Sequence, residues 1–307
     1  MKSVVIRADS SSELGTGHIR RDLVLAKREF PGRRVVFAVR DLPGNINAAI
    51  LAEGFEVALL ASNETSELLT LLEKTGADML VLDHYDIGIA QEREIARKAQ
   101  IPIFVIDDLY APHHCDILLN HNLYAEPARY EGLVPDHCEI RCGIDHMLLR
   151  DEFFEAQKKI ARPTRPSGRV FVAMGGTDHL NLSARIVEVL QNFPGLYADV
   201  VTSSANPRLE KLENALRTFG RRHTLHVDSD RIARLMAACD FAIVSPSVIL
   251  NEIVFMQRPF IAIQTADNQR EMADYLVRHR LPLLEAFDAE ALEREVAKMV
   301  RQTGEAR

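Results

Sequence analysis

The first stretch of the sequence that is rich in side chains capable of catalysis or ligand binding is residues 9–22, DSSSELGTGHIRRD. Two glycines, Gly15 and Gly17, come directly before His18. A histidine titrates near neutral pH, so His18 in a ligand site can act as a general base that removes a proton from water. A histidine that caps a helix or lies at the edge of the core is an equally good interpretation of the spacing alone.

Apolar residues on either side place this stretch between a strand and a helix. Residues 4–6 form a short apolar run, and residues 23–26 continue an apolar pattern that is typical of a helix. His18 is therefore expected at the start of a helix, where backbone N–H groups attract negative charge. Gly15, Thr16 and Gly17 are expected to lie against an anionic ligand such as a nucleotide sugar, with the glycines giving it clearance.

The glycine spacing excludes two common nucleotide motifs. Arg20 occupies the final glycine position of a G-x-G-x-x-G pattern, so a dinucleotide site is not warranted. The P-loop pattern G-x-x-x-x-G-K-[ST] is absent from the sequence.

Polar residues also follow two later apolar runs of the first half. Residues 83–86 read DHYD, and Asp107 and Asp108 come after the next run. Site residues accumulate at the carboxyl ends of parallel strands, which makes the polar and aromatic cluster at 83–86 suggestive. An ordinary turn, with Asp86 capping the next helix, fits that cluster equally well. Asp107 and Asp108 could bind a metal or orient a base, but adjacent residues point in different directions, and a cap or turn fits them as well.

The four cysteines are too few for a disulfide scaffold in a chain of 307 residues. Cys138 and Cys142 have the spacing C-x3-C with histidines nearby, but a single such pair is a weak zinc signal. Reduced, mostly buried thiols are the better interpretation, and no metal site is expected. Residues 113–116, HHCD, are interpreted as a loop.

In the second half, a double glycine lies between a strand pattern and a helix pattern. Gly175, Gly176 and Thr177 belong to the segment MGGTD. Such a turn lets backbone amides face a diphosphate, with the dipole of the following helix assisting. A plain tight turn is the alternative.

Hydroxyl, amide and carboxyl groups follow the strand pattern at residues 241–244. Ser245 and Ser247 precede a helix pattern that carries Asn251 and Glu252. Serine hydroxyls at a helix N-terminus can bond phosphate oxygens, and a glutamate one turn further on can accept both hydroxyls of a ribose. The alternative is a serine N-cap and a glutamate on a solvated face.

A further helix pattern opens with residues 266–269, ADNQ, after another strand. The amides of Asn268 and Gln269 could bond a sugar or the reacting water, or they could cap the helix. Candidates from both halves thus fall at strand ends, where they are expected to meet one ligand.

Strand and helix patterns alternate along the whole chain, which indicates parallel sheets built from βαβ units. The strand candidates are residues 4–7, 34–39, 56–60, 79–82, 103–106, 116–119, 139–141, 170–174, 198–202, 224–227, 241–244 and 260–263. The helix candidates include residues 66–74, 91–98, 181–191, 207–219, 231–238, 248–256, 268–279 and 289–301. The expected fold class is α/β, with two doubly wound, Rossmann-like domains.

A proline-rich stretch near the midpoint, residues 161–168, is expected to be the linker or the loop after a linking helix at 151–160. We therefore expect an N-terminal domain at 1–148 that carries His18 and a C-terminal domain at 149–307 that binds the nucleotide. Ligands of such sheets lie at the carboxyl ends of the strands, so a cleft between the two domains is expected.

Composition narrows the function classes. The chain has 47% hydrophobic and 26% charged residues and a net charge of −7, which argues against wholesale binding of nucleic acid or anionic membranes. No apolar run approaches the ~20 residues of a transmembrane helix. Arg7 and Asp9 interrupt any signal-peptide pattern at the N-terminus. We expect a cytoplasmic monomer with a small-molecule substrate, and neither nucleic acid nor membrane as a partner.

With these residues in hand, the chain resembles the UDP-sugar hydrolase family of the pseudaminic acid pathway over nearly its whole length. The matching segments are IRADSSSELGTGHIRRDLVLAK at 6–27, LVLDHYDI at 80–87, PHHCDILLNHN at 112–122, YEGLVPDHCEIRCG at 130–143, MGGTD at 174–178, SPSVILNE at 245–252 and DNQ at 267–269. The first and fourth segments are specific to that family rather than to nucleotide-sugar enzymes at large. Asp86 and Pro246 depart from the family pattern.

The resemblance implies a GT-B architecture of two Rossmann-like domains, with UDP bound mainly by the second. It also implies inverting hydrolysis, without metal or cofactor, of the anomeric C–O bond of a UDP-linked 2,4-diacetamido-2,4,6-trideoxy sugar of the L-altrose type. UDP and the free sugar would be released, the sugar for pseudaminic acid biosynthesis and flagellin glycosylation. His18 matches the family's water-activating histidine, and Tyr85 and Asn268 match positions that line the sugar site. The matches to the UDP site are Gly175, Gly176, Thr177, Ser245, Ser247 and Glu252.

Two other functions fit the same fold. In a glycosyltransferase that uses a UDP-sugar donor, His18 would deprotonate an acceptor hydroxyl instead of water. A nucleotide-sugar-binding protein without catalysis would tolerate replacement of His18.

Overall fold

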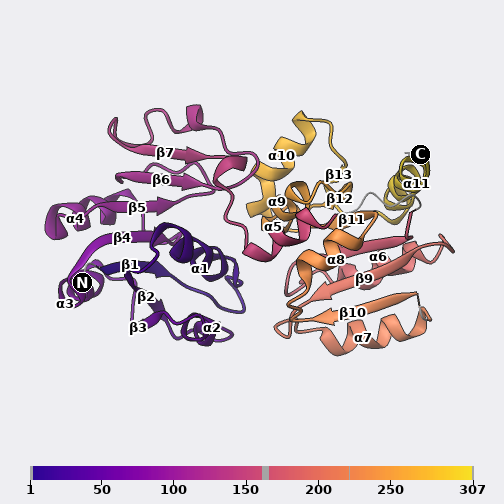
Figure 1. The fold of residues 1–307 in the computed structure, drawn as a ribbon, viewed down its shortest axis with the longest axis horizontal. Helices are drawn as coiled ribbons and strands as arrows, with labels where there is room; N and C mark the ends of the chain where they lie inside the picture. The colour runs from indigo at the N-terminus through magenta and orange to yellow at the C-terminus, as the bar shows by residue number, and fades with distance from the viewer. Residues whose placement is uncertain (1–2, 161–165, 221, 306–307) are drawn as a thin grey trace. The chain divides into compact units, whose positions relative to one another are not determined.

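The computed structural model describes residues 3–160, 166–220 and 222–305, and it divides into two compact units, Met1–Leu149 and Arg150–Arg307 (Figure 1). Each unit is built on one parallel sheet, with strand order β3-β2-β1-β4-β5-β6-β7 in the first and β10-β9-β8-β11-β12-β13 in the second. Helices pack on both faces of each sheet. The expected fold class, α/β with two doubly wound domains, is confirmed.

The first unit follows the predicted alternation of strands and helices. Its elements are β1 (Ser3–Ala8), α1 (Gly17–Glu29), β2 (Arg34–Arg40), α2 (Asn47–Ala52), β3 (Glu56–Leu60), α3 (Thr65–Thr75), β4 (Ala77–Asp83), α4 (Ile89–Ala99), β5 (Ile103–Ile106), β6 (Ile117–Asn120), η1 (Pro127–Tyr130), β7 (Glu139–Cys142) and η2 (Ile144–His146). Every strand expected in this half is present. The short helix α2 was not expected.

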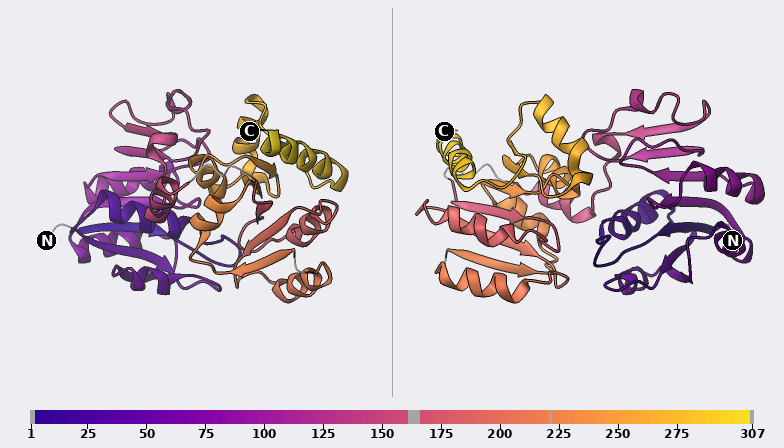
Figure 2. Two further views of the ribbon diagram at one scale, coloured as in Figure 1. Left: turned by 45° about the vertical axis from the view of Figure 1, so that its right-hand side comes forward. Right: turned by 180° about the vertical axis from the view of Figure 1, so that it is seen from behind.

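The side chains of β1 alternate between the two faces of the first sheet, as the period of a strand requires. Val4 and Ile6 belong to the core that includes α1 and α2, whereas Val5 belongs to the core that includes α3 and α4. Figures 1 and 2 show these two helix pairs on opposite faces of the sheet. Because both faces are covered, the central strands are continuous apolar runs.

The second unit repeats the same plan. Its elements are α5 (Asp151–Lys158), β8 (Arg169–Ala173), α6 (Leu182–Leu190), β9 (Tyr197–Thr202), α7 (Leu209–Thr218), β10 (His223–Val227), α8 (Ile232–Ala238), β11 (Phe241–Val244), α9 (Val248–Phe255), β12 (Phe260–Ile263), η3 (Asp267–Gln269), α10 (Arg270–Arg278), β13 (Leu283–Leu284) and α11 (Ala289–Glu305). One core joins α6, α7 and α11 to the sheet, and α5 packs against α8. The helix expected at 151–160 is α5, which belongs to this unit, and residues 161–165 of the expected linker lie outside the described residues.

Each sheet reverses its strand order at one place, the topological switch point. Ligands of doubly wound folds bind there, outside the carboxyl ends of the strands. In the first sheet the reversal lies between β1 and β4, where Ala8 pairs with Asp83. In the second it lies between β8 and β11, where Ala173 pairs with Val244. The loops after these four strands are therefore the positions expected to bind ligand.

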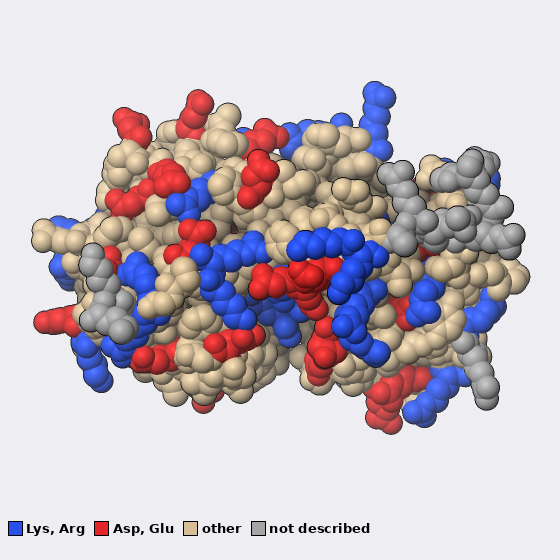
Figure 3. Space-filling view, viewed as in Figure 1, with Lys and Arg blue, Asp and Glu red and all other residues tan. Residues whose placement is uncertain are grey.

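Charged side chains of both signs are mixed on the face of the molecule that Figure 3 shows. Among the described residues, no helix has the length and apolar character needed to span a bilayer.

Candidate active site

The loop before α1 is held in a tight turn that places His18 in the first turn of the helix. Ser11 and Gly15 form an isolated β-bridge. Gly15 has a φ of 79°, a backbone conformation that residues other than glycine rarely adopt. Thr16 is the N-cap residue, without a side-chain capping hydrogen bond, and the first turn of α1 carries no acidic residue. A helix beginning beside His18 was expected from the sequence, and α1 begins at Gly17.

The imidazole of His18 is fixed by Asp83, the last residue of β4. Nδ1 of His18 lies 2.7 Å from Oδ1 of Asp83, whose side chain is 1% exposed. Arg21 and His18 hold the pKa of Asp83 well below its usual range, although burial alone would raise it. A carboxylate only accepts hydrogen bonds, so Nδ1 carries the proton and donates a hydrogen bond to Asp83.

Arg21 binds the same carboxylate from the next turn of α1. Its Nε donates to Oδ2 of Asp83 at 2.6 Å, and its Nη2 donates to Oδ1. Its Nη1 lies 3.0 Å from Oδ2 of Asp108, which follows β5. Arg21 therefore ties the carboxyl ends of two neighbouring strands, β4 and β5, to the helix that carries His18.

Tyr85 covers the outer side of the imidazole. The ring centroids of Tyr85 and His18 are 4.9 Å apart at an interplanar angle of 83°, which is an edge-to-face contact. Its hydroxyl donates to Oδ2 of Asp108 at 3.1 Å, and the side chain is half-exposed. The two contacts fix the tyrosine ring at the surface of the site.

These contacts leave one imidazole nitrogen for chemistry. With the proton on Nδ1, Nε2 has a lone pair, and no hydrogen bond to it is recorded among residues 3–160. The side chain of His18 is 11% exposed, so a water molecule can approach it. When Nε2 takes a proton, the charge that develops lies against the Asp83 carboxylate, which stabilises it.

His84 points away from this site and belongs to a second polar network. Its Nε2 lies 3.0 Å from Oδ2 of Asp9, a buried carboxylate that also binds Arg7 and Arg40. Hydrogen bonds from His84 and Arg7 lower the pKa of Asp9, against the effect of burial. Successive residues after β4 thus alternate between the two networks, as strand geometry requires.

The alternative interpretation of Asp86 as a helix cap is wrong. The N-cap residue of α4 is Gly88, whose N–H donates to Oε1 of Gln91 at 3.3 Å. Oδ2 of Asp86 accepts instead from Nδ2 of Asn63. Asp86 therefore joins the loop after β4 to the loop after β3.

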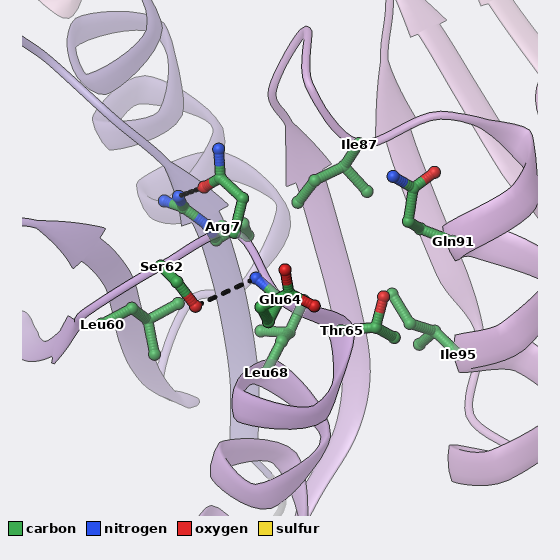
Figure 4. Close-up of a pocket in the computed structure, with 10 residues that line it drawn as sticks. Arg7, Leu60, Ser62, Glu64, Thr65, Leu68, Ile87, Gln91 and Ile95 are labelled. Carbon is green, nitrogen blue, oxygen red and sulfur yellow. Dashed lines mark hydrogen bonds between the residues drawn. The ribbon is translucent and has the colours of Figure 1, made fainter.

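A hollow beside this second network lies between α3 and α4 (Figure 4). Arg7, Leu68 and Ile95 are among its lining residues, and the close-up shows their side chains around it, from three elements. The hollow has no room for a water molecule. It is therefore a packing feature rather than a ligand site.

The adjacent carboxylates Asp107 and Asp108 point in different directions, as expected. Asp107 accepts hydrogen bonds from the hydroxyl of Tyr130 and from two backbone amides of its own loop, and it lies 3.4 Å from Nε2 of His113. Nδ1 of His113 lies 2.6 Å from Oε1 of Glu92. Although burial opposes it, contacts with Asp107 and Glu92 raise the pKa of His113 to about 9. The loop at 113–116 thus contributes a buried ion pair as well as a connection.

Metal ligation finds no support in the part of the chain that the structure describes. No group of three or more His, Cys, Asp or Glu side chains there is arranged to hold a metal ion. All four cysteines are free thiols; Cys115 and Cys239 are buried, and Cys138 and Cys142 are partly buried.

In the second unit, the glycine turn after β8 presents free backbone amides. Gly175 has a φ of 83°, and both glycines are exposed. The carbonyl of Gly176 accepts hydrogen bonds from Thr202 and Ser203, which fixes the turn. Within residues 166–220, no hydrogen bond donated by the amides of Gly175, Gly176 or Thr177 is recorded. Three N–H groups on a fixed turn can bind an anion.

The helix that follows this turn does not assist as expected. Asp178 is buried, and its carboxylate accepts hydrogen bonds from the amides of Leu182 at 2.8 Å and Ser183 at 3.0 Å. The N-terminus of α6 is therefore already occupied by a protein carboxylate. The prediction that the N-terminus of α6 assists in binding a diphosphate is therefore wrong for these two amides, because both already donate to Asp178.

The N-terminus of α9, by contrast, has no side-chain cap among residues 222–305. Ser247 is its N-cap residue without a side-chain cap hydrogen bond, and the hydroxyls of Ser245 and Ser247 lie 3.2 Å apart. Both hydroxyls follow β11, directly beside β8 in the sheet. They lie at the switch point, together with the helix start at Val248.

Asn251 and Glu252 lie in the first turns of α9. Asn251 is 1% exposed, and the side chain of Glu252 is 14% exposed. Oε1 of Glu252 lies 3.7 Å from Nη2 of Arg150, a long ion pair within this unit. The arrangement is compatible with a carboxylate that also accepts hydrogen bonds from a ligand.

Asn268 and Gln269 differ in their environment. Asn268 is exposed in η3. The amide of Gln269 binds Thr265 with both ends: Oε1 accepts from the Thr265 N–H at 2.8 Å, and Nε2 donates to its hydroxyl at 3.0 Å. Gln269 therefore shapes the turn after β12, and Asn268 is the group that remains available for a ligand.

Sequence reasoning missed the partners of His18. Asp83 was a candidate only as part of the cluster at 83–86 and not as the partner of His18. Arg21 and the buried residues Asp22 and His121 beside it were not among the candidates. The signal for Asp83 was its place directly after a predicted strand, because site residues accumulate at the carboxyl ends of parallel strands. The helical spacing of His18, Arg21 and Asp22 was a second signal, because residues three and four apart share one helix face.

Comparison with known proteins gives one relative of high similarity. No family model matches the chain. The UDP-2,4-diacetamido-2,4,6-trideoxy-β-L-altropyranose hydrolase of Campylobacter jejuni subsp. jejuni serotype O:2 is 38% identical over 278 residues, which cover 90% of this chain and 96% of that protein.

Solved structures resemble the chain over nearly its full length at low sequence identity. The spinosyn rhamnosyltransferase SpnG has a TM-score of 0.69 and 14% identity, covering 99% of this chain and 93% of that one. HepE from Anabaena, in complex with UDP and glucose, has a TM-score of 0.61 and 12% identity, covering 99% and 92%. The shared architecture is the two-domain GT-B fold.

Proposed function

The chain belongs to the family of the UDP-2,4-diacetamido-2,4,6-trideoxy-β-L-altropyranose hydrolase, and on this premise we propose that it hydrolyses the anomeric C–O bond of a UDP-linked sugar of that class. Water attacks the anomeric carbon, the bond to the diphosphate oxygen breaks, and the products are UDP and the free sugar with inverted configuration. The free sugar would serve pseudaminic acid biosynthesis and flagellin glycosylation.

The observation that carries the mechanism is the contact between His18 and Asp83. A buried carboxylate that binds Nδ1 leaves Nε2 as the base, and it stabilises the imidazolium after proton transfer. Tyr85 and Asn268 are proposed to line the sugar site. Gly15, Thr16 and Gly17 give clearance to the sugar and the diphosphate beside His18.

We assign the nucleotide to the second unit. The free amides of Gly175, Gly176 and Thr177 and the open start of α9 with Ser245 and Ser247 support a diphosphate site at its switch point. Glu252, with Asn251 beside it in α9, is proposed to accept the ribose hydroxyls. Amides and a helix N-terminus can stabilise a leaving diphosphate, so the proposed reaction uses no metal and no cofactor.

The proposed setting is a cytoplasmic monomer with water as the second substrate. The four free thiols support a reducing compartment. A glycosyltransferase with the same fold remains the competing function, in which the base deprotonates an acceptor hydroxyl.

A UDP-release assay tests the proposal. Purified protein is incubated with a panel of UDP-2,4-diacetamido-2,4,6-trideoxy sugars and with UDP-N-acetylglucosamine, without any acceptor and with excess EDTA. Release of UDP from the L-altro sugar under these conditions is the expected result. A rate that requires an added acceptor would favour the transferase, and a rate that the chelator abolishes would contradict metal independence.

A variant of His18 tests the base. His18→Asn keeps a side-chain N–H that can donate to Asp83 but has no basic nitrogen to accept a proton, so kcat should fall by about 10²- to 10⁴-fold while UDP still binds. Near-normal turnover would refute the mechanism and favour a role for His18 in binding alone.

A further inference from the structure

Asp22 is a carboxyl group buried beside the His18–Asp83 pair. It lies in α1, one turn after His18 and next to Arg21, and it is 0% exposed. Burial of an ionised carboxylate is costly unless donors surround it. The environment of Asp22 therefore determines whether it carries a charge.

No donor of the described residues reaches Asp22. Neither of its carboxyl oxygens accepts a hydrogen bond, which is rare for a buried polar group. The guanidinium of its neighbour Arg21 is directed at Asp83 and Asp108 instead. An ionised Asp22 would thus be buried without the partners that it needs.

The carboxyl group of Asp22 lies close enough to that of Asp83 for the two to share a hydrogen bond, which requires a proton on one of them. Asp83 already accepts hydrogen bonds from His18 and Arg21, which hold it in the ionised form. The proton of the pair is therefore on Asp22. Burial and the negative charge of Asp83 raise the pKa of Asp22 well above its usual range, which agrees with this assignment.

We propose that Asp22 is a positioning residue, which stays protonated and donates a hydrogen bond to the carboxylate of Asp83. This bond is a further fixed contact on Asp83, besides those from Arg21, and it holds the carboxylate against Nδ1 of His18. The inference rests on the proposed function, because it gives Asp22 a part in orienting the base of that reaction.

The other titratable groups of this cluster come from several elements. Arg21 and His18 lie in α1, Asp83 ends β4, and Asp108 follows β5. His121, after β6, faces Arg21, Asp83 and His18, and burial lowers its pKa to about 3. His121 is therefore neutral wherever the base is active, and Arg21 is the permanent cation of the cluster.

The test compares Asp22→Asn and Asp22→Leu with the surface control Asp136→Asn in the full chain. Each protein is assayed for kcat, for KM and for the pH profile of kcat in UDP-sugar hydrolysis. Asparagine is neutral and can donate to Asp83, so kcat should stay within about threefold of wild type, with the acid limb of the profile at the same pH. Leucine removes the donor, so kcat should fall by about tenfold with little change in KM.

Two kinetic results would overturn the proposal. If Asp22 were ionised, Asp22→Asn would remove a buried negative charge near His18, and the acid limb would move to lower pH by about one unit or more. Full activity of a folded Asp22→Leu would show that the donor is not used.

A spectroscopic measurement keeps the test valid if Asp22→Leu does not fold. In protein labelled with ¹³C at the aspartate carboxyl carbons, the resonance that is missing in Asp22→Asn identifies Asp22. A protonated-acid chemical shift across the active pH range is expected, and a carboxylate shift would refute the proposal. No substrate is used, so failure of the proposed function and failure of this inference are distinguishable.

Discussion

Nδ1 of His18 lies 2.7 Å from Oδ1 of Asp83, and Arg21 binds that same carboxylate through two nitrogens. The three side chains are buried or nearly so, and bulk ions therefore screen their interaction only weakly. The first unit by itself thus fixes the tautomer and the orientation of the imidazole. In the proposed mechanism, the base is therefore aligned before any ligand binds, which lowers the cost of reaching the transition state.

Asp83→Asn is expected to lower kcat by about 10²- to 10⁴-fold. The amide can no longer stabilise the imidazolium of His18, and Arg21 loses its charged partner. Stopped assays of UDP release give kcat, and calorimetry gives UDP affinity. Affinity for UDP should stay near that of wild type, because the nucleotide is assigned to the second unit. An equal loss of UDP binding would contradict that assignment.

Tyr85 offers a pair of matched variants. Tyr85→Phe keeps the ring on His18 and loses only the hydrogen bond to Asp108, so kcat should change by less than about threefold. Tyr85→Ala also removes the edge-to-face contact, and kcat should fall by about tenfold. The ratio of the two kcat values is the measurement. Equal losses in both variants would assign the effect to the hydroxyl rather than to the ring.

Glu252→Ala is expected to weaken UDP binding by about 10- to 100-fold, the value of a charged hydrogen-bonding group, with a smaller effect on the chemical step. Calorimetric titration with UDP measures the affinity, and single-turnover kinetics measures the rate of the chemical step. Glu290→Ala is the control, since Glu290 is an exposed glutamate of the same unit. Unchanged UDP affinity in the Glu252 variant would remove this residue from the site.

The raised pKa of His113 predicts that the stability of the protein depends on pH. Its pKa is about 9 in the folded protein and 6.5 for the unperturbed group, since Asp107 and Glu92 favour the charged form against burial. Below pH 6.5 the ion pairs contribute fully to stability. As pH rises to 9 the unfolded chain releases this proton first, so the free energy of unfolding should fall by about 3 kcal/mol.

Urea denaturation of wild type and His113→Gln at pH 6.5 and 9 measures this effect. The glutamine does not titrate, so the variant should lose less stability over the interval. Equal losses in both proteins would show that His113 carries no proton in the folded state.

The fold was predictable to the extent that its elements are long. Parallel strands covered on both faces give continuous apolar runs, and such runs locate β1, β5 and β12 from the sequence. Two elements carried too little pattern: α2 has six residues, and β13 has two. Neither is long enough for its periodicity to be distinguished from that of a loop.

The site was predictable only in part. The position of His18 follows from local signals, whereas its contact with Asp83 joins residues 65 positions apart and depends on the register of β1 with β4. Asp83 and Tyr85 contact His18, whereas His84 contacts Asp9. This assignment of residues 83–85 to two networks could have been inferred from the alternation of side chains along a strand. The capping of α6 by Asp178 depends on a left-handed backbone conformation that the sequence does not reveal.

Hydrolysis in H₂¹⁸O tests the central claim, that water activated by His18 attacks the anomeric carbon. Wild-type protein is incubated with the UDP-linked L-altro sugar, the anomer first formed is read by NMR, and the label is located by mass spectrometry. We predict that ¹⁸O enters the free sugar, that UDP is unlabelled, and that the configuration is inverted. Label in the UDP phosphate, or a retained anomer, would contradict the account.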